Sequence, residues 1–463
     1  MSSRCDALVL FGATGDLAKR KLFPALQELA RDGRLPARIV GVASSDWSDD
    51  QLRARAREGI TAHATLHEDT FRRLEEALTY VQGDYREADT FERLRKTLDD
   101  AKRPLLYLAI PPSLFETVVQ GLAEVGLHEH ARVVVEKPFG RDLDSSRHLN
   151  RCLLSTFPEE AVFRVDHFLG KEEVLDLLVF RFANTFLAPA WNRNYVDSVQ
   201  ITLSESFGVE GRGKFYEEVG ALRDVVQNHL LEVVTLVAME PPVGADAQAL
   251  RDEKVKVLRS MPPLNPADVV LGQYRGYRHE TGVDPDSQVE TFVALRAEID
   301  SWRWADVPFY IRAGKKLAAT ATEVLVEFKQ PPRLFFARSD APLPHPNHLK
   351  FRVKPGERVS LSVQIKQPGE ELLSRDVDLA YTYDEAREGI RTDAYARLLD
   401  DALKGDQRLF ARADAVEEAW RVVQPVLDDP PPLHGYEPGS WGPAEADALT
   451  DTWHCPDVAA DCD

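Results

Sequence analysis

Cysteine is scarce in this chain. Its 463 residues include four cysteines, Cys5, Cys152, Cys455 and Cys462, and no two of them have the CxxC spacing of a zinc site. Cysteines scattered in this way also do not indicate a disulfide framework. We therefore expect no metal site and a reducing, cytoplasmic location.

Long apolar runs are absent as well. No run approaches the roughly 20 residues that a membrane-spanning helix requires. The opening residues, MSSRCDA, have no apolar region behind a basic start, so we expect no signal peptide. A membrane partner is not expected either.

Positive charge is in deficit. The chain has 57 Lys and Arg against 76 Asp and Glu, which gives a formal net charge of −19. Nucleic-acid binding depends on Lys and Arg that neutralise phosphates, so this balance argues against a nucleic-acid partner. An anionic ligand would need a local cluster of basic residues.

The residues that are present indicate two domains. With 44% hydrophobic residues, a chain of this length can form more than one core. In the first part, continuous apolar runs alternate with helical patterns, which is typical of a parallel sheet covered on both faces. Downstream, several runs alternate apolar and polar residues, which indicates an α+β domain with a large, mostly antiparallel sheet. The predicted strands are residues 6–12, 38–44, 105–110 and 131–138, followed by 198–206, 290–299, 323–330, 348–354, 358–366 and 376–384.

A glycine-containing turn follows the first predicted strand, in LVLFGATGDLAKRK at residues 8–21. Gly12 and Gly15 lie between a strand and a helix, where glycines let backbone amides approach a pyrophosphate. The spacing is GxxGxxA rather than GxGxxG, so a tight turn without a ligand is the alternative interpretation. Three basic residues in the first turns of the helix oppose its dipole, which a nearby anion would explain. These residues are Lys19, Arg20 and Lys21.

This turn makes residues 1–165 a candidate dinucleotide-binding domain with an α/β, Rossmann-like, doubly wound sheet. Residues 166–430 then form the α+β domain. A Pro-rich, acidic tail follows at residues 431–463.

Three further segments contain residues suited to acid–base or anion chemistry. FRVDHFLGKEEV (163–174) places an acid, an imidazole and an ammonium within two turns. GALRDVVQNHLLEVVTLVAME (220–240) contains His229 in an apolar helix, and VPFYIRAGKKL (307–317) ends a strand with a glycine and two lysines. Each segment also has a structural explanation: a helix cap with a surface lysine, a core histidine and a charged turn.

Taken together and in this order, the four segments resemble the glucose-6-phosphate dehydrogenase family. The resemblance covers nearly the whole chain, from GATGDLAKRK to YEPGSWGP, and RVDHFLGKE beside RDVVQNHLL is highly specific to that family. Further matching blocks are EKPFG (136–140), NTFLAPAWNR (184–193), SESFGVEGRGKFYEEVGALRDVVQNHLL (204–231) and DAYARLLDDALKGDQRLFARADAVEEAWRVVQPVL (393–427).

The resemblance implies an oxidoreductase that oxidises C1 of D-glucose 6-phosphate to 6-phospho-D-glucono-1,5-lactone. A nicotinamide cofactor would accept the hydride, in the first step of the oxidative pentose phosphate pathway. The general base would be His229, because an imidazole titrates near neutral pH. Asp166 would accept a hydrogen bond from the other ring nitrogen and stabilise the imidazolium. The apolar helix around His229 would keep the ring neutral until its partner is engaged.

The same resemblance assigns the contacts with the substrate phosphate. His167, Lys171 and Lys315 would hold it, and Lys21 would also reach the substrate. Where some members have a further cation five residues beyond Lys315, this chain has Thr320, and Lys316 could compensate.

The remaining substrate contacts involve the sugar and the cofactor side. Glu205 and Asp224 would accept hydrogen bonds from the sugar hydroxyls. Lys137 would lie between cofactor and substrate, placed there by a cis proline at Pro138.

Cofactor choice depends on RIVGVASSDWSDD, residues 38–50. Ser44 stands where NADP-preferring members usually have an arginine. A charge-assisted hydrogen bond is worth about 1.5–3 kcal/mol, so its loss should weaken 2′-phosphate binding about tenfold to a hundredfold. An NAD enzyme would place an acid there, and Asp46 lies two residues late. The resemblance assigns Gly12, Thr14, Gly15, Asp16, Leu17, Ser44 and Lys137 to the cofactor.

We therefore expect relaxed or dual cofactor use, with NADP as the family default and NAD as a second cofactor. The alternative is that neighbouring groups restore full NADP preference. The candidates for that role are Ser44, Ser45, Thr14, Lys19 and Arg20.

Three other functions remain as alternatives. The first is a catalytically inactive relative that binds nucleotide or sugar phosphate as a regulatory partner, against which the retention of His229 and Asp166 counts. The second is an oxidoreductase for another, unphosphorylated sugar, which would not need the phosphate cluster. The third, a stand-alone nucleotide-binding scaffold, does not explain the second half. The family assembles as dimers or dimers of dimers through the large sheet of the second domain. The resemblance therefore implies a homodimer or homotetramer, with substrate binding and oligomerisation both assigned to residues 166–430.

Overall fold

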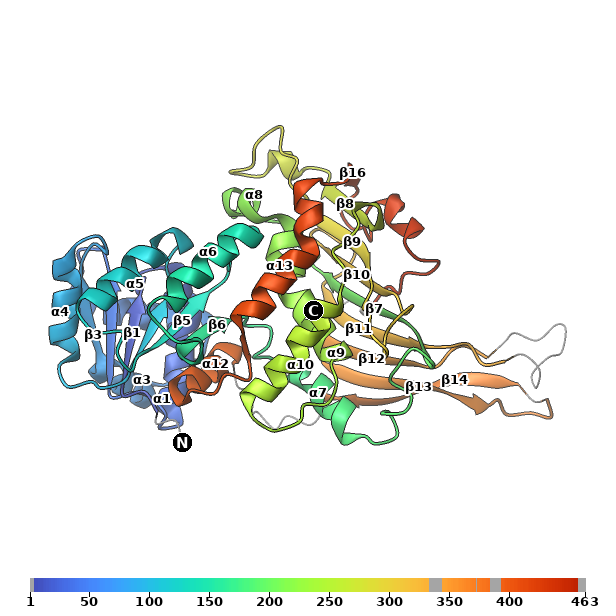
Figure 1. The fold of residues 1–463 in the computed structure, drawn as a ribbon, viewed down its shortest axis with the longest axis horizontal. Coiled ribbons are helices and arrows are strands. Elements are labelled where there is room, and N and C mark those ends of the chain that lie inside the picture. Colours follow the sequence, from blue (N-terminus) through green and yellow to red (C-terminus); the bar gives the residue numbers. More distant parts are fainter. Residues whose placement is uncertain (1–3, 333–343, 372, 384–392, 457–463) are drawn as a thin grey trace. The chain divides into compact units, whose positions relative to one another are not determined.

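The computed structural model of the chain describes residues 4–332, 344–371, 373–383 and 393–456 (Figure 1). The chain forms two compact units. Unit 1 comprises Met1–Lys171, Pro242–Asp252 and Arg391–Glu417, and unit 2 comprises Glu172–Pro241, Glu253–Ile390 and Glu418–Asp463. Each unit contains one β-sheet.

The sheet of unit 1 has seven strands in the order β15-β6-β5-β4-β1-β2-β3. Every neighbouring pair is parallel except β15 and β6, which are antiparallel. The strands are β1 (Ala7–Phe11), β2 (Arg38–Ala43), β3 (Leu78–Gln82), β4 (Pro104–Leu108), β5 (Arg132–Glu136), β6 (Val162–Val165) and β15 (Phe410–Ala411).

Helices pack in two groups beside this sheet (Figure 1). Helix α1 packs against α2, α3 and α12, whereas α5 packs against α4 and α6. Because β1 and β4 are apolar and buried at every position, they need this cover. The helices are η1, a π-helical segment (Ala18–Leu22), α1 (Phe23–Arg31), α2 (Asp49–His63), α3 (Glu68–Ala77), α4 (Ala88–Leu98), α5 (Phe115–Glu124), α6 (Leu143–Leu154) and α12 (Ala394–Lys404).

Unit 1 is built from segments far apart in the sequence. The backbone N–H of Cys5 donates to Leu403 O at 2.8 Å, which fixes the end of α12 beside the start of β1. Strand β15 extends the sheet by pairing Phe410 with Val165. The domains predicted from the sequence, residues 1–165 and 166–430, are each one continuous segment. Each compact unit instead combines three separate segments of the chain.

The sheet of unit 2 has nine strands in the order β14-β13-β12-β11-β7-β10-β9-β8-β16. Neighbours are antiparallel except for two parallel pairs, β7 with β10 and β8 with β16. The strands are β7 (Val196–Ser204), β8 (Val269–Tyr274), β9 (Phe292–Ala297), β10 (Phe309–Gly314), β11 (Ala321–Phe328), β12 (His348–Lys354), β13 (Arg358–Lys366), β14 (Ser374–Thr382) and β16 (Leu433–Tyr436).

Helices of unit 2 pack against this sheet. Helix α7 contacts β12, and the π-helical segment η4 contacts β10. Two longer helices, α10 and α13, contain residues of both units. The helices are α7 (Glu172–Ala183), α8 (Gly213–Ala221), η4 (Leu222–Leu230), α9 (Leu231–Ala238), α10 (Ala247–Ser260) and α13 (Ala413–Asp428).

The predicted fold class is confirmed: a parallel, Rossmann-like sheet precedes an α+β part with a large, mostly antiparallel sheet. Residues of the predicted acidic tail enter the second sheet, because Leu433–Tyr436 forms β16 beside β8. Among the described residues, no helix has the length and apolar character needed to cross a bilayer.

A half-buried carboxyl, that of Glu136, ends β5. The hydroxyl of Tyr107 on β4 donates to Glu136 Oε1 at 2.5 Å. Burial is the main cause that raises the pKa of Glu136 from 4.5 to about 7. The folded chain therefore holds a proton on this carboxyl more tightly than the unfolded chain does.

This carboxyl predicts a pH-dependent stability. Between about pH 4.5 and 7 the folded state binds more protons than the unfolded state, so the contribution of Glu136 falls as pH rises. Glu136→Gln keeps an acceptor for Tyr107 and removes the titration. Thermal unfolding of both proteins at about pH 5 and about pH 8 should show the wild type losing stability relative to the variant at the higher pH. Parallel pH profiles would contradict this assignment.

Candidate active site

The loop after β1 has the geometry that a nucleotide phosphate needs. Gly12 has a φ of +78°, and a Cβ there would lie 2.2 Å from Ala109 O, so only glycine fits. The N–H of Gly15 donates to Gly12 O at 2.9 Å and tightens the turn before the helix. A backbone free of side chains at this point can approach a pyrophosphate closely.

Hydroxyl groups from two strand ends meet beside this loop. Ser45 Oγ donates to Thr14 Oγ1 at 3.1 Å. Ser44 directly follows β2 and is exposed. Lys19 in η1 forms an ion pair with Glu58 of α2, whereas Lys21 is exposed. Of the predicted basic residues, Lys19 is therefore already engaged by a carboxylate.

The ends of β5 and β6 bring two predicted residues to the same edge of the sheet. These strands are parallel and pair Glu136 with Val165, so Lys137 and Asp166 follow at neighbouring positions. The Lys137–Pro138 peptide is cis, as the resemblance implies. The carboxyl edge of a parallel sheet is where ligands bind in open α/β folds.

Asp166 begins a tight turn that carries three predicted residues. Its side chain is 2% exposed, and its Oδ1 accepts the N–H of Phe168 at 2.9 Å. Backbone bonds from Leu169 N to Asp166 O at 3.1 Å and from Lys171 N to Phe168 O at 3.2 Å continue the turn. The Lys171 ammonium lies 4.4 Å from the centre of the Phe168 ring.

Helix α12 supports this turn from a distant part of the chain. The ring of Tyr395 stacks on His167 with centroids 5.9 Å apart and planes 10° apart. Arg397 Nη1 donates to Gly170 O at 2.9 Å. A Cβ on Gly170 would lie 2.8 Å from Ala394 O, so the glycine permits the close approach. Sequence reasoning missed Tyr395 and Arg397; their block, DAYARLL, matched the family but gave no sign of where it packs.

In unit 2, Glu205 and Lys315 lie together. They follow β7 and β10, a parallel pair in which Ser204 is opposite Gly314. Lys315 Nζ donates to Glu205 Oε2 at 2.5 Å, and both side chains are largely buried. The Lys315 ammonium also lies 5.3 Å from the ring centre of Phe207 and 5.5 Å from that of Tyr216. The pair therefore holds an ammonium and a carboxylate in fixed positions at one strand edge.

Thr320, which stands where some members have a cation, and Lys316, considered as its replacement, both have other partners. Thr320 Oγ1 accepts the N–H of Ser206 at 2.9 Å. Lys316 forms an ion pair with Glu210 at 3.1 Å. Of the two lysines in this turn, Lys315 is therefore the one that pairs with Glu205, a predicted substrate-binding residue.

Asp224 and His229 both lie on η4. Residues five apart in an α-helix are rotated by about 140° from one another, whereas π-helical bonds join residue i to i+5 and bring such positions closer to one face. The side chain of His229 is 5% exposed. The π-helical segment is a feature that the apolar pattern did not predict.

A glycine and a buried glutamate start this helix. Gly220 has a φ of +63°, and a Cβ there would lie 2.3 Å from Glu290 Oε1. The same oxygen accepts the N–H of Leu222 at 2.9 Å. Glu290 thus caps the helix that carries Asp224 and His229, and sequence reasoning missed both Gly220 and Glu290.

Each unit therefore contains some of the predicted site residues. Unit 1 brings together Lys137, Asp166, His167 and Lys171 at its strand edge, near the Gly12 loop. Unit 2 pairs Glu205 with Lys315 and carries Asp224 and His229 on η4. The pairing of Asp166 with His229 joins residues of different units and stays a prediction.

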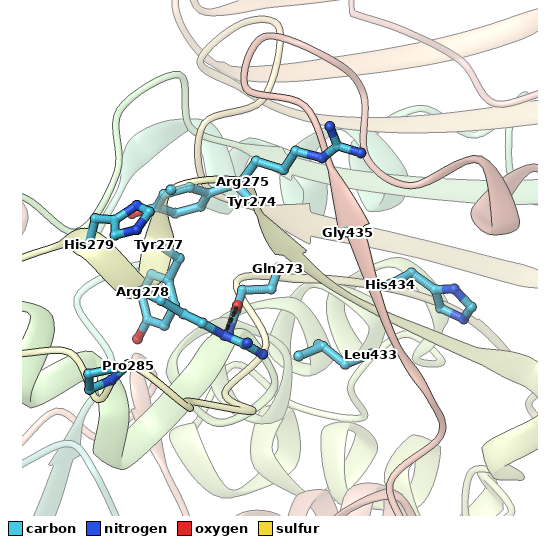
Figure 2. Close-up of a pocket in the computed structure, with 11 residues that line it drawn as sticks. Gln273, Tyr274, Arg275, Tyr277, Arg278, His279, Pro285, Leu433, His434 and Gly435 are labelled. Carbon is cyan, nitrogen blue, oxygen red and sulfur yellow. Dashed lines mark hydrogen bonds between the residues drawn. The ribbon is translucent and has the colours of Figure 1, made fainter.

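A pocket of about 390 Å³ lies elsewhere in unit 2, lined by residues of β8, of the turn after β8 and of β16 (Figure 2). Three of its basic groups have partners: Arg278 Nε donates to Gln273 Oε1 at 3.1 Å, Arg275 pairs with Glu437 at 2.6 Å, and His434 lies 3.1 Å from Glu445. None of the predicted site residues lines it. The lining residues are Gln273, Tyr274, Arg275, Gly276, Tyr277, Arg278, His279, Pro285, Leu433, His434 and Gly435.

Comparison with known proteins gives matches over both halves of the chain. Residues 9–176 match the domain described as "Glucose-6-phosphate dehydrogenase, NAD binding domain", and residues 178–454 match "Glucose-6-phosphate dehydrogenase, C-terminal domain". The chain is 48% identical over 446 residues to glucose-6-phosphate 1-dehydrogenase 1 of Mycobacterium tuberculosis, covering 96% of this chain and 94% of that protein.

Solved structures of this family also match nearly the whole chain. The crystal structure of glucose-6-phosphate 1-dehydrogenase from Mycobacterium avium is 47% identical, with a TM-score of 0.92 over 99% of this chain and 100% of the other. A glucose-6-phosphate dehydrogenase in complex with its substrate glucose-6-phosphate is 35% identical, with a TM-score of 0.89 over 97% and 98%. The order of motifs, the two sheets and these matches together show that the chain belongs to the glucose-6-phosphate dehydrogenase family.

Proposed function

We propose that this protein is a glucose-6-phosphate dehydrogenase. It oxidises C1 of D-glucose 6-phosphate to 6-phospho-D-glucono-1,5-lactone and passes the hydride to NADP⁺ or NAD⁺. The observation that carries the proposal is that the chain matches both family domains. It also has the residues to which we assign the roles of base, carboxylate and phosphate ligands, namely His229, Asp166, His167, Lys171 and Lys315. The substrate named for a 35% identical relative supports the choice of sugar phosphate.

His229 is the general base of this proposal. Removal of the O1 proton must accompany departure of the hydride from C1, and an imidazole is suited to take that proton near neutral pH. Its buried place on η4 limits competition from water for the ring nitrogens. Asp166 is proposed to accept a hydrogen bond from the second ring nitrogen, which fixes the tautomer and stabilises the imidazolium.

Three cations anchor the substrate phosphate in this proposal. His167 and Lys171 come from the turn after β6, and Lys315 from the end of β10. The stacking of Tyr395 on His167 and the ion pair of Lys315 with Glu205 hold two of these groups in place before substrate binds. On a chain with a net charge of −19, basic side chains held in place in this way are what an anionic sugar phosphate requires.

The nicotinamide cofactor supplies the hydride acceptor. The residues proposed to hold it are those of the loop after β1 and the end of β2, which fit because Gly12 leaves the backbone uncovered and Thr14 and Ser45 present hydroxyl groups. Lys137 is proposed to lie between cofactor and substrate. With Ser44 in place of arginine, we propose use of both NADP and NAD.

The oligomeric state and the location in the cell are also proposals. A homodimer or homotetramer and a cytoplasmic location are consistent with the family and are not needed for the chemistry. An inactive regulatory relative remains the alternative, and turnover measurements decide between the two.

Replacement of the base should abolish most turnover. In His229→Asn the kcat should fall by about a hundredfold to ten-thousandfold, because a general base acts mainly in the transition state. Binding of glucose 6-phosphate should change little. Initial rates and calorimetric titration of the variant with the sugar phosphate would measure both. Wild-type turnover in this variant would rule out His229 as the base.

Replacement of a residue that binds the phosphate should change the kinetic constants in a different way from replacement of the base. In Lys171→Thr, kcat/KM for glucose 6-phosphate should fall by about tenfold to a thousandfold, through both a higher KM and a lower kcat, because the anchor also positions C1. Unphosphorylated glucose is the matched control, since its kcat/KM should be low and unaffected. An equal loss for both sugars would show that Lys171 does not contact the phosphate.

A further inference from the structure

Although Ser44 replaces the usual arginine, another arginine lies against the cofactor loop of unit 1. Arg55 is on α2, and its Nη2 lies 3.5 Å from Thr14 O and 3.7 Å from Asp16 Oδ1. Thr14 is the residue whose hydroxyl accepts from Ser45. The guanidinium therefore lies against the backbone of the loop whose Thr14 hydroxyl binds Ser45.

Two features of α2 place Arg55 there. At its N-terminus, Ser48 caps the helix, and Asp49 accepts the N–H of Tyr80 on β3 at 2.7 Å. One turn after Arg55, Gly59 lies against η1, where a Cβ would be 2.3 Å from Lys19 O. Because residues four apart share a helix face, this close packing directs position 55 towards the loop that begins η1.

The contacts of Arg55 are loose compared with those of its neighbours. Its Nη1 lies 3.4 Å from Glu58 and its Nη2 3.7 Å from Asp16, whereas charge-assisted hydrogen bonds are usually about 2.7–2.9 Å. Arg57 on the same helix binds both oxygens of Glu68, at 2.7 and 2.9 Å. Arg55 is thus held near the loop without a tight carboxylate pair, so its donors can turn to a ligand.

Two other cations of this region bind groups outside the cofactor loop. Arg53 donates to the carbonyls of Glu75 and Leu78 at 3.1 Å each. Lys19 forms a close ion pair with Glu58. Arg55 is therefore the α2 arginine that faces the cofactor loop.

We propose that Arg55 recognises the 2′-phosphate of NADP⁺, in place of the arginine that Ser44 replaces. This inference rests on the proposed function. A phosphate held by the hydroxyls of Thr14 and Ser45 would receive donors from the Arg55 guanidinium, at the cost of its loose contacts with Asp16 and Glu58. When NAD⁺ binds, those carboxylates still neutralise Arg55. The chain should therefore prefer NADP⁺ and still accept NAD⁺.

Binding measurements without sugar phosphate test this inference independently of turnover. In Arg55→Gln, the Kd for NADP⁺ should rise by about tenfold to a hundredfold, whereas the Kd for NAD⁺ should stay the same. Arg57→Gln, on the same helix and paired with Glu68, is the matched control and should change neither. Calorimetric titration with each dinucleotide gives the constants, and kcat/KM with each cofactor should follow them.

A second variant separates loss of the cation from loss of local structure. Adding Ser44→Arg to Arg55→Gln should recover tight NADP⁺ binding, because it restores a cation at the usual position. An Arg55→Gln variant that keeps the wild-type Kd for NADP⁺ would overturn the proposal. A wild type with equal affinity for the two dinucleotides would also overturn it. Failure of the proposed function would appear instead as absence of turnover with intact dinucleotide binding.

Discussion

The register of parallel strands is the constraint on which the candidate site depends. In unit 1, β5 and β6 pair Glu136 with Val165, so Lys137 and Asp166 leave the sheet side by side. In unit 2, β7 and β10 pair Ser204 with Gly314, and Glu205 and Lys315 follow. Parallel strands end at one edge, so the residue after each strand joins a common cluster, and a slip of one residue would turn these side chains to the opposite face.

Two supports outside the strands complete these clusters. In unit 1, α12 comes from more than 200 residues further along the chain and holds the Asp166–Lys171 turn through Tyr395 and Arg397. In unit 2, the buried carboxylate of Glu290 fills the space beside Gly220 and caps the π-helical segment that carries His229. Arg397 and Glu290 bind backbone groups, and Tyr395 stacks on the His167 ring, so these supports set where the functional side chains can be.

The sequence predicted what depends on local pattern. Continuous apolar runs marked β1, β2, β4 and β5, and glycine between strand and helix marked the Gly12 loop. The periodicity of apolar residues does not indicate which segments distant in the sequence pack against one another. The positions of α12 and β15 in unit 1 could therefore not be predicted. His229 was ambiguous for a related reason: apolar neighbours suit a core histidine and a buried base equally. The engagement of Lys19 by Glu58 and the position of Arg55 also needed the packing of α2 on η1.

The central proposal is that residues at the strand edges of both sheets serve one reaction, with Asp166 acting through His229. A double-mutant cycle on kcat tests it most directly, with Asp166→Asn, His229→Asn and the double variant measured under saturating glucose 6-phosphate and NADP⁺. If the two residues act as a unit, the double variant should be about as slow as His229→Asn alone. Losses that multiply in the double variant would show that the two residues act independently and would contradict the account.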